Sequence, residues 1–176
     1  MRRMSLGVLV LALCVTPALR AQRQPTEGIR FGLAVGATMP LGDYGTADKL
    51  GLNVMGVLQV PLSGSPLHLR IDALYSSTAH DAGSGSTSIL GGNVGVLYHF
   101  AAPAATARPY VLGGLGLYNI SAFGSSATKI GFGFGGGVLF GLGGFNAFAE
   151  ARYISVQASG SSLTFVPISV GLMFGY

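Results

Sequence analysis

The last nine residues of the chain, 168–176, have an apolar side chain at every second position, and the positions between them are small or mostly polar. Because the side chains of a β-strand point alternately to its two faces, this pattern predicts a strand with one wholly apolar face. That face consists of Ile168, Val170, Leu172, Phe174 and Tyr176. A long apolar strand at the edge of a water-soluble domain favours aggregation, whereas lipid would cover the same strand in a membrane barrel.

The composition is that of a membrane protein without membrane helices. Only 9% of the 176 residues are charged and 49% are hydrophobic, yet no run of about 18 apolar residues exists beyond the amino terminus. Apolar residues spread over short alternating segments are typical of a membrane β-barrel. The length predicts one domain.

The amino terminus has the pattern of a secretory signal peptide at 1–21. Two arginines supply a positive start, 6–15 an apolar stretch, and 18–21 a cleavage region. The only cysteine, Cys14, lies in the apolar stretch, so we expect neither a lipid anchor nor a disulfide in 22–176. Cleavage removes three of the ten basic residues and leaves seven against six acidic ones. This near-neutral balance gives no indication of nucleic-acid binding.

The remaining residues, 22–176, divide into eight alternating segments separated by turn residues, which predicts an all-β, eight-stranded antiparallel up-and-down transmembrane β-barrel. The predicted strands are 28–39, 52–60, 67–77, 87–100, 109–120, 129–140, 145–156 and 163–176. An even number of strands with short connections at one end places both termini in the periplasm. The loops that face outward are then 40–49, 78–86, 121–128 and 157–162.

Two orientations of the strands are stereochemically possible. In the third segment Arg70 and Asp72 line the lumen of a membrane barrel, or the outside of a soluble ligand-binding barrel. The sixth segment favours the membrane orientation, because its apolar residues alternate with Gly131, Gly133, Gly135 and Gly137. A water-facing row of glycines would only destabilise the strand, whereas in a narrow lumen it makes room. A turn at 141–144 would set these glycines opposite Ile154, Arg152, Glu150 and Phe148, in that order.

Aromatic residues gather where lipid headgroups would lie, as is typical of both interfaces of a membrane barrel. The predicted inner group is Phe31, Phe100, Tyr110, Phe140, Phe145 and Tyr176, and the outer group is Tyr75, Tyr118 and Tyr153. The fifth segment is apolar on both faces. We expect Tyr110 and Tyr118 to point outward.

With eight amphipathic strands, a signal peptide and this ending, the chain resembles the small outer-membrane β-barrel family that includes the membrane domain of outer membrane protein A. The sharpest element is the carboxyl-terminal assembly signal of that family, whose places are filled by Ser169, Gly171, Phe174 and Tyr176. The resemblance implies insertion by the barrel-assembly machinery and a bacterial outer-membrane location, with membrane lipid and lipopolysaccharide as neighbours. We expect a monomer. We expect no peptidoglycan-binding domain after the barrel, so that tethering role is not implied.

Four charged residues are the leading candidates for a functional cluster: Arg70, Asp72, Glu150 and Arg152. In a ring of eight, the third and seventh strands lie across the lumen from each other, and all four side chains fall at middle depth. An unpaired buried charge is very costly. We therefore expect a neutral ion-pair network that plugs the lumen, helped by Asn93 and Gln59. A gate that opens to pass ions or small solutes is the alternative.

The remaining motifs give weaker evidence for a functional site. His68 and His99 face inward on neighbouring strands, but two histidines without a third ligand are weak evidence for a metal site. A hydrolase would need a nucleophile, base and acid together, and the nearest candidates are His80, Asp81, Ser84 and Ser86. Asp43, Asp48 and Asp81 on outer loops are expected to be solvated rather than to bind cations. We expect no catalytic residue, metal or cofactor.

The sequence thus predicts a non-enzymatic protein of the outer membrane that has an envelope-structural role or forms a small, mostly closed pore. A soluble periplasmic lipocalin-like barrel that binds an apolar ligand is the competing prediction. A barrel-embedded lipid-modifying enzyme is a third.

Overall fold

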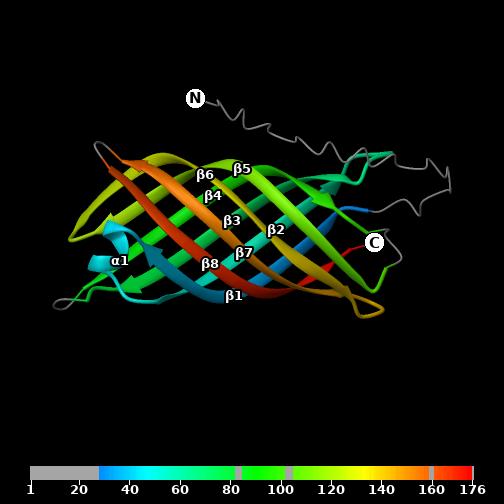
Figure 1. The fold of residues 1–176 in the computed structure, drawn as a ribbon, viewed down its shortest axis with the longest axis horizontal. Coiled ribbons are helices and arrows are strands. Elements are labelled where there is room, and N and C mark those ends of the chain that lie inside the picture. The colour runs from blue at the N-terminus through cyan, green and yellow to red at the C-terminus, as the bar shows by residue number, and fades with distance from the viewer. Residues whose placement is uncertain (1–27, 82–84, 102–104, 159–160, 176) are drawn as a thin grey trace, which may run out of the picture.

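The computed structural model describes residues 28–81, 85–101, 105–158 and 161–175. Its strands form one closed barrel, in which each strand pairs antiparallel with the next and β8 pairs with β1 (Figure 1). The strands are β1 (Arg30–Leu41), β2 (Gly51–Pro61), β3 (Leu67–Ala79), β4 (Ser86–His99), β5 (Ala107–Ala122), β6 (Ser125–Gly141), β7 (Asn146–Ala158) and β8 (Ser161–Phe174). The predicted fold class is confirmed, and every predicted strand overlaps an observed one. The predicted signal peptide at 1–21 lies outside the described residues.

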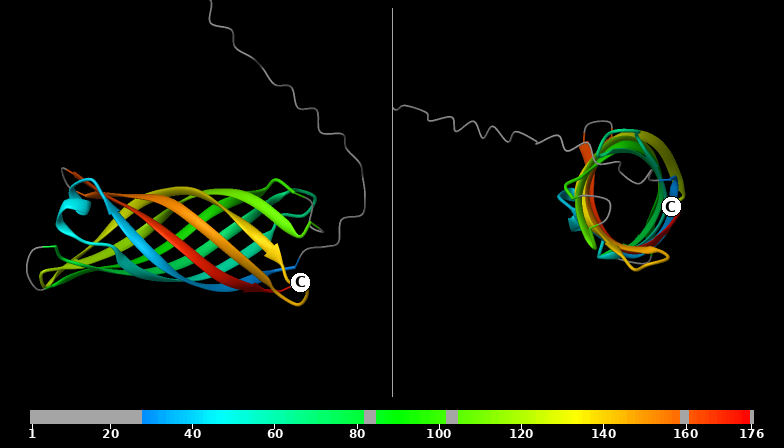
Figure 2. Two further views of the ribbon diagram at one scale, coloured as in Figure 1. Left: turned by 60° about the horizontal axis from the view of Figure 1, so that its bottom comes forward. Right: turned by 90° about the vertical axis from the view of Figure 1, so that its right-hand side faces the viewer.

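The two ends of the barrel differ in what they carry. β1 begins and β8 ends at the same end, where Phe31 is the register partner of Phe174. We call this the terminal end. A short helix, α1 (Asp43–Ala47), lies between β1 and β2 at the opposite end, which we call the α1 end (Figure 2). No helix among the described residues is long and apolar enough to cross a membrane.

The apolar faces of the strands point out and the polar faces point in. In β3, Ile71 and Tyr75 are exposed on the outside, whereas Arg70 and Asp72 are buried in the lumen. The same alternation holds in β1, where Leu33 is 72% exposed and its neighbour Ala34 is buried. This is the arrangement predicted for a barrel in lipid, and the reverse of the one that a soluble barrel with an apolar interior requires.

The hairpin of β5 and β6 extends through most of the loop predicted at 121–128. Its turn consists of Phe123 and Gly124, with φ angles of 50° and 74°. Positive φ at both central residues is the geometry of a two-residue hairpin turn whose twist matches that of the strands. Phenylalanine rarely adopts this conformation, which is why the sequence did not indicate so tight a turn.

The register between β6 and β7 differs from the predicted one by two residues. Gly135 lies opposite Arg152 and Gly137 opposite Glu150, because the turn is centred later, on 142–145, and is closed by a hydrogen bond from the Leu142 amide to the Phe145 carbonyl of 3.0 Å. A shift of two residues keeps the same faces inward, since side chains alternate with period two. The prediction that glycines of β6 face large lumen side chains of β7 is therefore confirmed, but each glycine faces a residue two positions from the predicted one.

The outward orientation predicted for Tyr110 and Tyr118 is wrong. Both rings are buried in the lumen, and Val111, Leu115 and Leu117 take the outer face of β5. The physical reason is cross-strand space: Tyr110 lies opposite Gly137, and Tyr118 lies opposite Gly91. Of the other predicted belt residues, Tyr176 lies outside the described residues and Tyr153 is half-buried. The exposed ones are Phe31, Tyr75, Phe100, Phe140 and Phe145.

Candidate functional site

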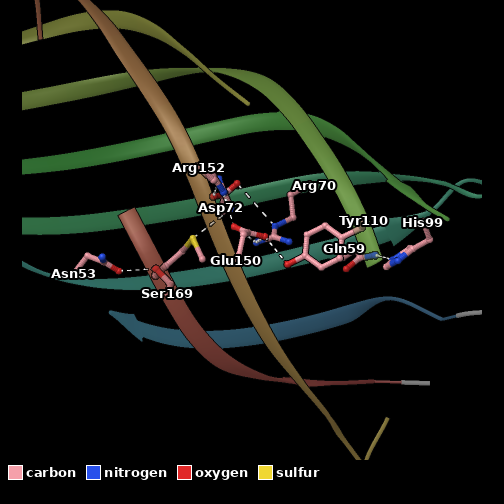
Figure 3. Close-up of polar contacts among 10 residues, drawn as sticks. Asn53, Gln59, Arg70, Asp72, His99, Tyr110, Glu150, Arg152 and Ser169 are labelled. Carbon is pink, nitrogen blue, oxygen red and sulfur yellow. Dashed lines mark hydrogen bonds and ion pairs between the residues drawn. The ribbon is translucent and has the colours of Figure 1, made fainter. Parts of the chain in front are cut away.

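The four predicted charged residues meet in the middle of the lumen (Figure 3). Arg70 and Asp72 come from β3 and Glu150 and Arg152 from β7, and each residue is at most 5% exposed. The Arg70 Nη2 atom lies 3.2 Å from Glu150 Oε2, and the Arg152 Nε atom donates to Glu150 Oε1 at 2.5 Å. Arg152 Nη1 also donates to Asp72 Oδ1, and Arg70 Nε lies 4.0 Å from Asp72 Oδ2.

The cluster is neutral and crosses the lumen. Two guanidinium groups meet two carboxylates, so the cluster itself buries no net charge. Glycines are the cross-strand partners of three of the four long side chains: Arg70 faces Gly95, Glu150 faces Gly137 and Arg152 faces Gly135. A Cβ at Gly135 would lie 3.0 Å from Arg152 Cγ, so this glycine makes room for that side chain. The central prediction, that topology would bring β3 and β7 charges together, agrees with this geometry.

Three further side chains complete the cluster, and the sequence did not indicate them. The Tyr110 hydroxyl donates to Glu150 Oε2 at 2.7 Å. Arg152 Nη2 donates to the sulfur of Met55 at 3.3 Å, and the Arg70 guanidinium lies 5.9 Å from the centre of the Phe148 ring. The sequence pattern predicts an outward-facing Tyr110, and for this reason it does not place this residue in the cluster.

The two predicted helpers make their hydrogen bonds elsewhere. Asn93 is the register partner of Asp72, but its Oδ1 atom accepts from the Tyr118 hydroxyl at 2.5 Å. Gln59 Nε2 lies 3.0 Å from His99 Nε2 (Figure 3). Asn93 thus belongs to the layer on the α1 side of the ion pairs, and Gln59 to a layer on the terminal side.

The inward-facing histidines lie side by side near the terminal end. The His68 and His99 rings meet edge to face with centroids 4.8 Å apart, and His99 also lies 5.6 Å from Tyr110. Within the described residues no group of three or more His, Cys, Asp or Glu side chains could hold a metal ion. The pair packs as part of the lumen filling.

A second polar network ties the α1 loop into the barrel. The Tyr44 hydroxyl donates to Thr78 Oγ1 at 2.6 Å, and Thr78 donates to Asp48 Oδ2 at 2.6 Å. His80 Nε2 lies 3.2 Å from Thr87 Oγ1 and 3.8 Å from Asp48 Oδ1. Burial raises the pKa of Tyr44 to about 12, and the nearby Asp48 carboxylate adds to the shift. The expectation that Asp48 is a solvated loop residue is wrong, because it is 5% exposed.

Those candidate hydrolase residues that the structure describes, His80, Asp81 and Ser86, do not come together as a catalytic group. The His80 ring contacts Asp48 and Thr87 and stacks on Phe123 at 4.4 Å. Asp81 instead forms an exposed ion pair of 3.3 Å with Lys49. Ser84 lies outside the described residues, and Ser86 begins β4 opposite Ala79.

The predicted assembly signal lies on the last strand. The Ser169 hydroxyl faces the lumen and donates to Asn53 Oδ1 at 2.8 Å (Figure 3). Gly171 leaves space inside the barrel, because a Cβ there would lie 2.6 Å from Ala34 Cβ and 2.8 Å from Phe148 Cε1. The Phe174 ring is exposed, 5.8 Å from Phe31 across the closing strand pair. Tyr176 lies outside the described residues.

Known proteins share this architecture. A family model described as outer membrane protein beta-barrel domain matches residues 6–175. No curated protein matches the sequence. Among solved structures, Neisserial surface protein A is 18% identical over 85% of this chain and 98% of its own, with a TM-score of 0.70.

Two other structures show that proteins with this fold have very different descriptions. The outer membrane enzyme PagL is 20% identical over 84% of this chain and 99% of its own, with a TM-score of 0.55. Ail, the attachment invasion locus protein of Yersinia pestis, is 14% identical over the same shares, with a TM-score of 0.52. At these identities the likeness shows the fold alone, since one fold supports many functions.

Proposed function

Because the chain belongs to the outer membrane protein β-barrel domain family, we propose that it is a non-enzymatic outer-membrane protein whose plugged lumen makes it a structural element of the envelope or a mostly closed pore. The observation that carries the proposal is the neutral cluster of Arg70, Asp72, Glu150 and Arg152, which bridges β3 and β7 at mid-depth. The charges of the two guanidinium groups and the two carboxylates cancel, so the cluster as a whole has no net charge to attract a passing ion, although the Arg70 Nε and Nη1 atoms make no hydrogen bond among the described residues.

Layers on both sides of the cluster support a closed lumen. Towards the α1 end the Phe165 ring packs edge to face against Tyr118 and Tyr44, with centroids 6.2 and 6.5 Å apart. Towards the terminal end, Gln59, His68 and His99 are each at most 5% exposed. An eight-stranded barrel is only wide enough to be filled by its side chains, and these layers fill it on either side of the cluster.

The proposal includes the placement in the membrane. The exposed outer face would contact lipid, and both termini would lie in the periplasm with the α1 end facing out, where lipopolysaccharide is the neighbour. Ser169, Gly171, Phe174 and Tyr176 would be read by the barrel-assembly machinery. We propose a monomer that has no nucleic-acid partner, exported by the signal peptide predicted at 1–21.

Planar-bilayer recording tests the closed lumen. The parent protein should give no unitary current steps at either polarity. Glu150→Ala removes the carboxylate that holds both arginines and should produce steps in protein whose heat-dependent gel mobility shows that it is folded. Asp81→Ala, which breaks only an exposed ion pair, should stay silent. Reproducible opening and closing of the parent protein would overturn the plug and support a gate.

The non-enzymatic part of the proposal has its own test. It is supported by the contacts of His80, whose Nε2 atom meets both Thr87 and Asp48, so that one ring nitrogen would have to serve as base and as partner of the acid. Mass spectrometry of lipid A and phospholipids from cells that overexpress the protein should show unchanged acylation. A changed acyl pattern that His80→Ala abolishes would overturn this assignment.

A further inference from the structure

A hollow at the α1 end of the lumen is not explained by the plug. It has a volume of about 470 Å³ and opens between α1 and the ends of β5, β6 and β8. We call it the outer vestibule. Its wall includes the inward-facing side chains of Tyr44, Ile120, Ala122, Ala127, Lys129 and Leu163. The volume falls within the range of small-molecule sites, roughly 300–1,000 Å³.

The lumen wall is divided into two chemically different sectors at this depth. Thr38, Asn53, Ser76 and Thr78 form a polar sector on β1 to β3, and their hydrogen bonds to one another and to α1 hold the loop down. The sector on β5 to β8 is apolar: Ile120 and Leu163 line the hollow, and the fully buried Val156 and Phe165 belong to the same packed cluster. Apolar side chains that line a concave, solvent-reached surface are typical of a ligand site rather than of a channel.

The vestibule has a floor, an aromatic layer of which Tyr44 alone lines the hollow itself. The Phe165 ring is fully buried and packs edge to face against both Tyr44 and Tyr118. This aromatic layer separates the hollow from the ion pairs below it. A molecule in the vestibule therefore enters from the α1 end and does not cross the barrel.

One basic side chain lies at the deep end of the apolar wall. Lys129 is the register partner of Tyr118, a floor residue, whereas Ala127 and Ser125 lie one and two steps further out, opposite Ile120 and Ala122. Lys129 is half-buried. The acidic side chain that lines the vestibule, Asp43, lies on α1 and is exposed. This distribution favours an anionic group at the floor and an apolar tail along Ile120 and Leu163.

We propose that the outer vestibule binds a free amphipathic monoanion with one short apolar tail, with its anionic end at Lys129. The site goes beyond the proposed function, because it requires only the mouth of the lumen and not a closed interior. The structural basis is the coincidence of an apolar wall, an aromatic floor and a deep ammonium group in one cavity.

Titration with hexanoate of the labelled protein in lipid nanodiscs tests this site by NMR. The amides of Ala122 and Ala127 should shift in a saturable way, while those on the lipid face stay unchanged after subtraction of effects from membrane partitioning. Hexylamine, which has the same tail and opposite charge, should bind at least about tenfold more weakly, since one charged hydrogen bond is worth about 1.5–3 kcal/mol.

Matched variants assign the binding to named side chains. Lys129→Gln should weaken hexanoate binding about tenfold, Lys129→Arg should retain it, and Ile120→Ser should weaken it through the tail. Lys49→Gln is the control, because that lysine is exposed and pairs with Asp81 outside the vestibule. Absence of a saturable shift in the parent protein, equal binding by Lys129→Gln, or equally tight binding of hexylamine would each overturn the proposal, whatever the bilayer recordings give.

Discussion

Single glycines decide which large side chains the lumen accepts. Tyr110 faces Gly137 across the β5–β6 pair, and a Cβ at Gly137 would lie 2.6 Å from the Tyr110 hydroxyl and 2.4 Å from the Ala149 carbonyl oxygen. The second of these contacts is with backbone, so it is not relieved by a rotamer change. The Tyr110 hydroxyl in turn donates to Glu150, which links one missing methyl group to the central ion pairs.

Gly137→Ala should therefore lower the free energy of unfolding by roughly 1–3 kcal/mol, the usual cost of overpacking. Gly92→Ala is the matched control, because a Cβ there meets no atom within 4 Å. Equilibrium unfolding in urea, followed by the gel mobility of unheated samples, measures both variants. Equal losses for the two would show that Gly137 is not making room.

Cross-strand pairs such as that of Tyr110 with Gly137 also explain which residues could be placed from the sequence and which could not. Arg70, Asp72, Glu150 and Arg152 were placed correctly, since strand alternation alone sets their face. Tyr110 and Tyr118 were not, because β5 is apolar on both sides and only the cross-strand partners distinguish them. Those partners depend on register, which a single strand does not contain.

At the scale of an element, α1 is held in place by the side chain of Tyr44 rather than by its own helical stability. It has five residues and no side-chain cap at its N-terminus, and isolated helices this short are unstable in water. Tyr44 inserts into the lumen, packs on Phe165 and donates to Thr78. The sequence predicted only a loop at 40–49, because the residues that Tyr44 contacts, Thr78 and Phe165, lie far along the chain.

The pKa of Tyr44, raised to about 12 by burial, makes this docking depend on pH. A released loop would titrate near the ordinary tyrosine pKa of about 10. The docked state is then fully favoured below about pH 10 and loses stability as the pH rises from about 10 towards 12, because only the released tyrosine can ionise there. Tyr110 and Tyr118 are buried too, so the tyrosinate absorbance of the parent protein is compared with that of Tyr44→Phe, and the difference between the two should titrate near pH 12. A Tyr44 pKa at the ordinary value would contradict the docking.

At the scale of the whole molecule, the ion-pair cluster is the contact that joins opposite walls of the barrel. Neighbouring strands are already fixed by their hydrogen-bonded ladders, but β3 and β7 meet only through the lumen. The alternation of each strand and the eight-membered ring together predicted this meeting. The individual contacts, such as Arg152 with both Glu150 and Asp72, depend on side-chain rotamers and on the space left by glycines.

The charge balance of this cluster predicts that replacing Asp72 destabilises the protein more than replacing Asp81. Asp72→Asn leaves two arginines against one carboxylate in a buried site, and breaking a buried pair in this way costs about 3–5 kcal/mol. Asp81→Asn removes one exposed partner of Lys49 and should cost about 0–1 kcal/mol. Unfolding in urea of both variants in the same lipid checks the difference. Similar losses would mean that the lumen is hydrated enough to screen its charges.

A double variant tests whether neutrality or a particular contact stabilises the barrel. Asp72→Asn combined with Arg152→Met removes one charge of each sign and leaves the Arg70–Glu150 pair, whose atoms lie 3.2 Å apart. If neutrality matters, the double variant should recover much of the stability that Asp72→Asn loses, because no uncompensated charge remains buried. The coupling energy from the full double-mutant cycle measures this recovery. Additive losses would indicate instead that Arg152 stabilises the barrel through Glu150 and Met55, independently of Asp72.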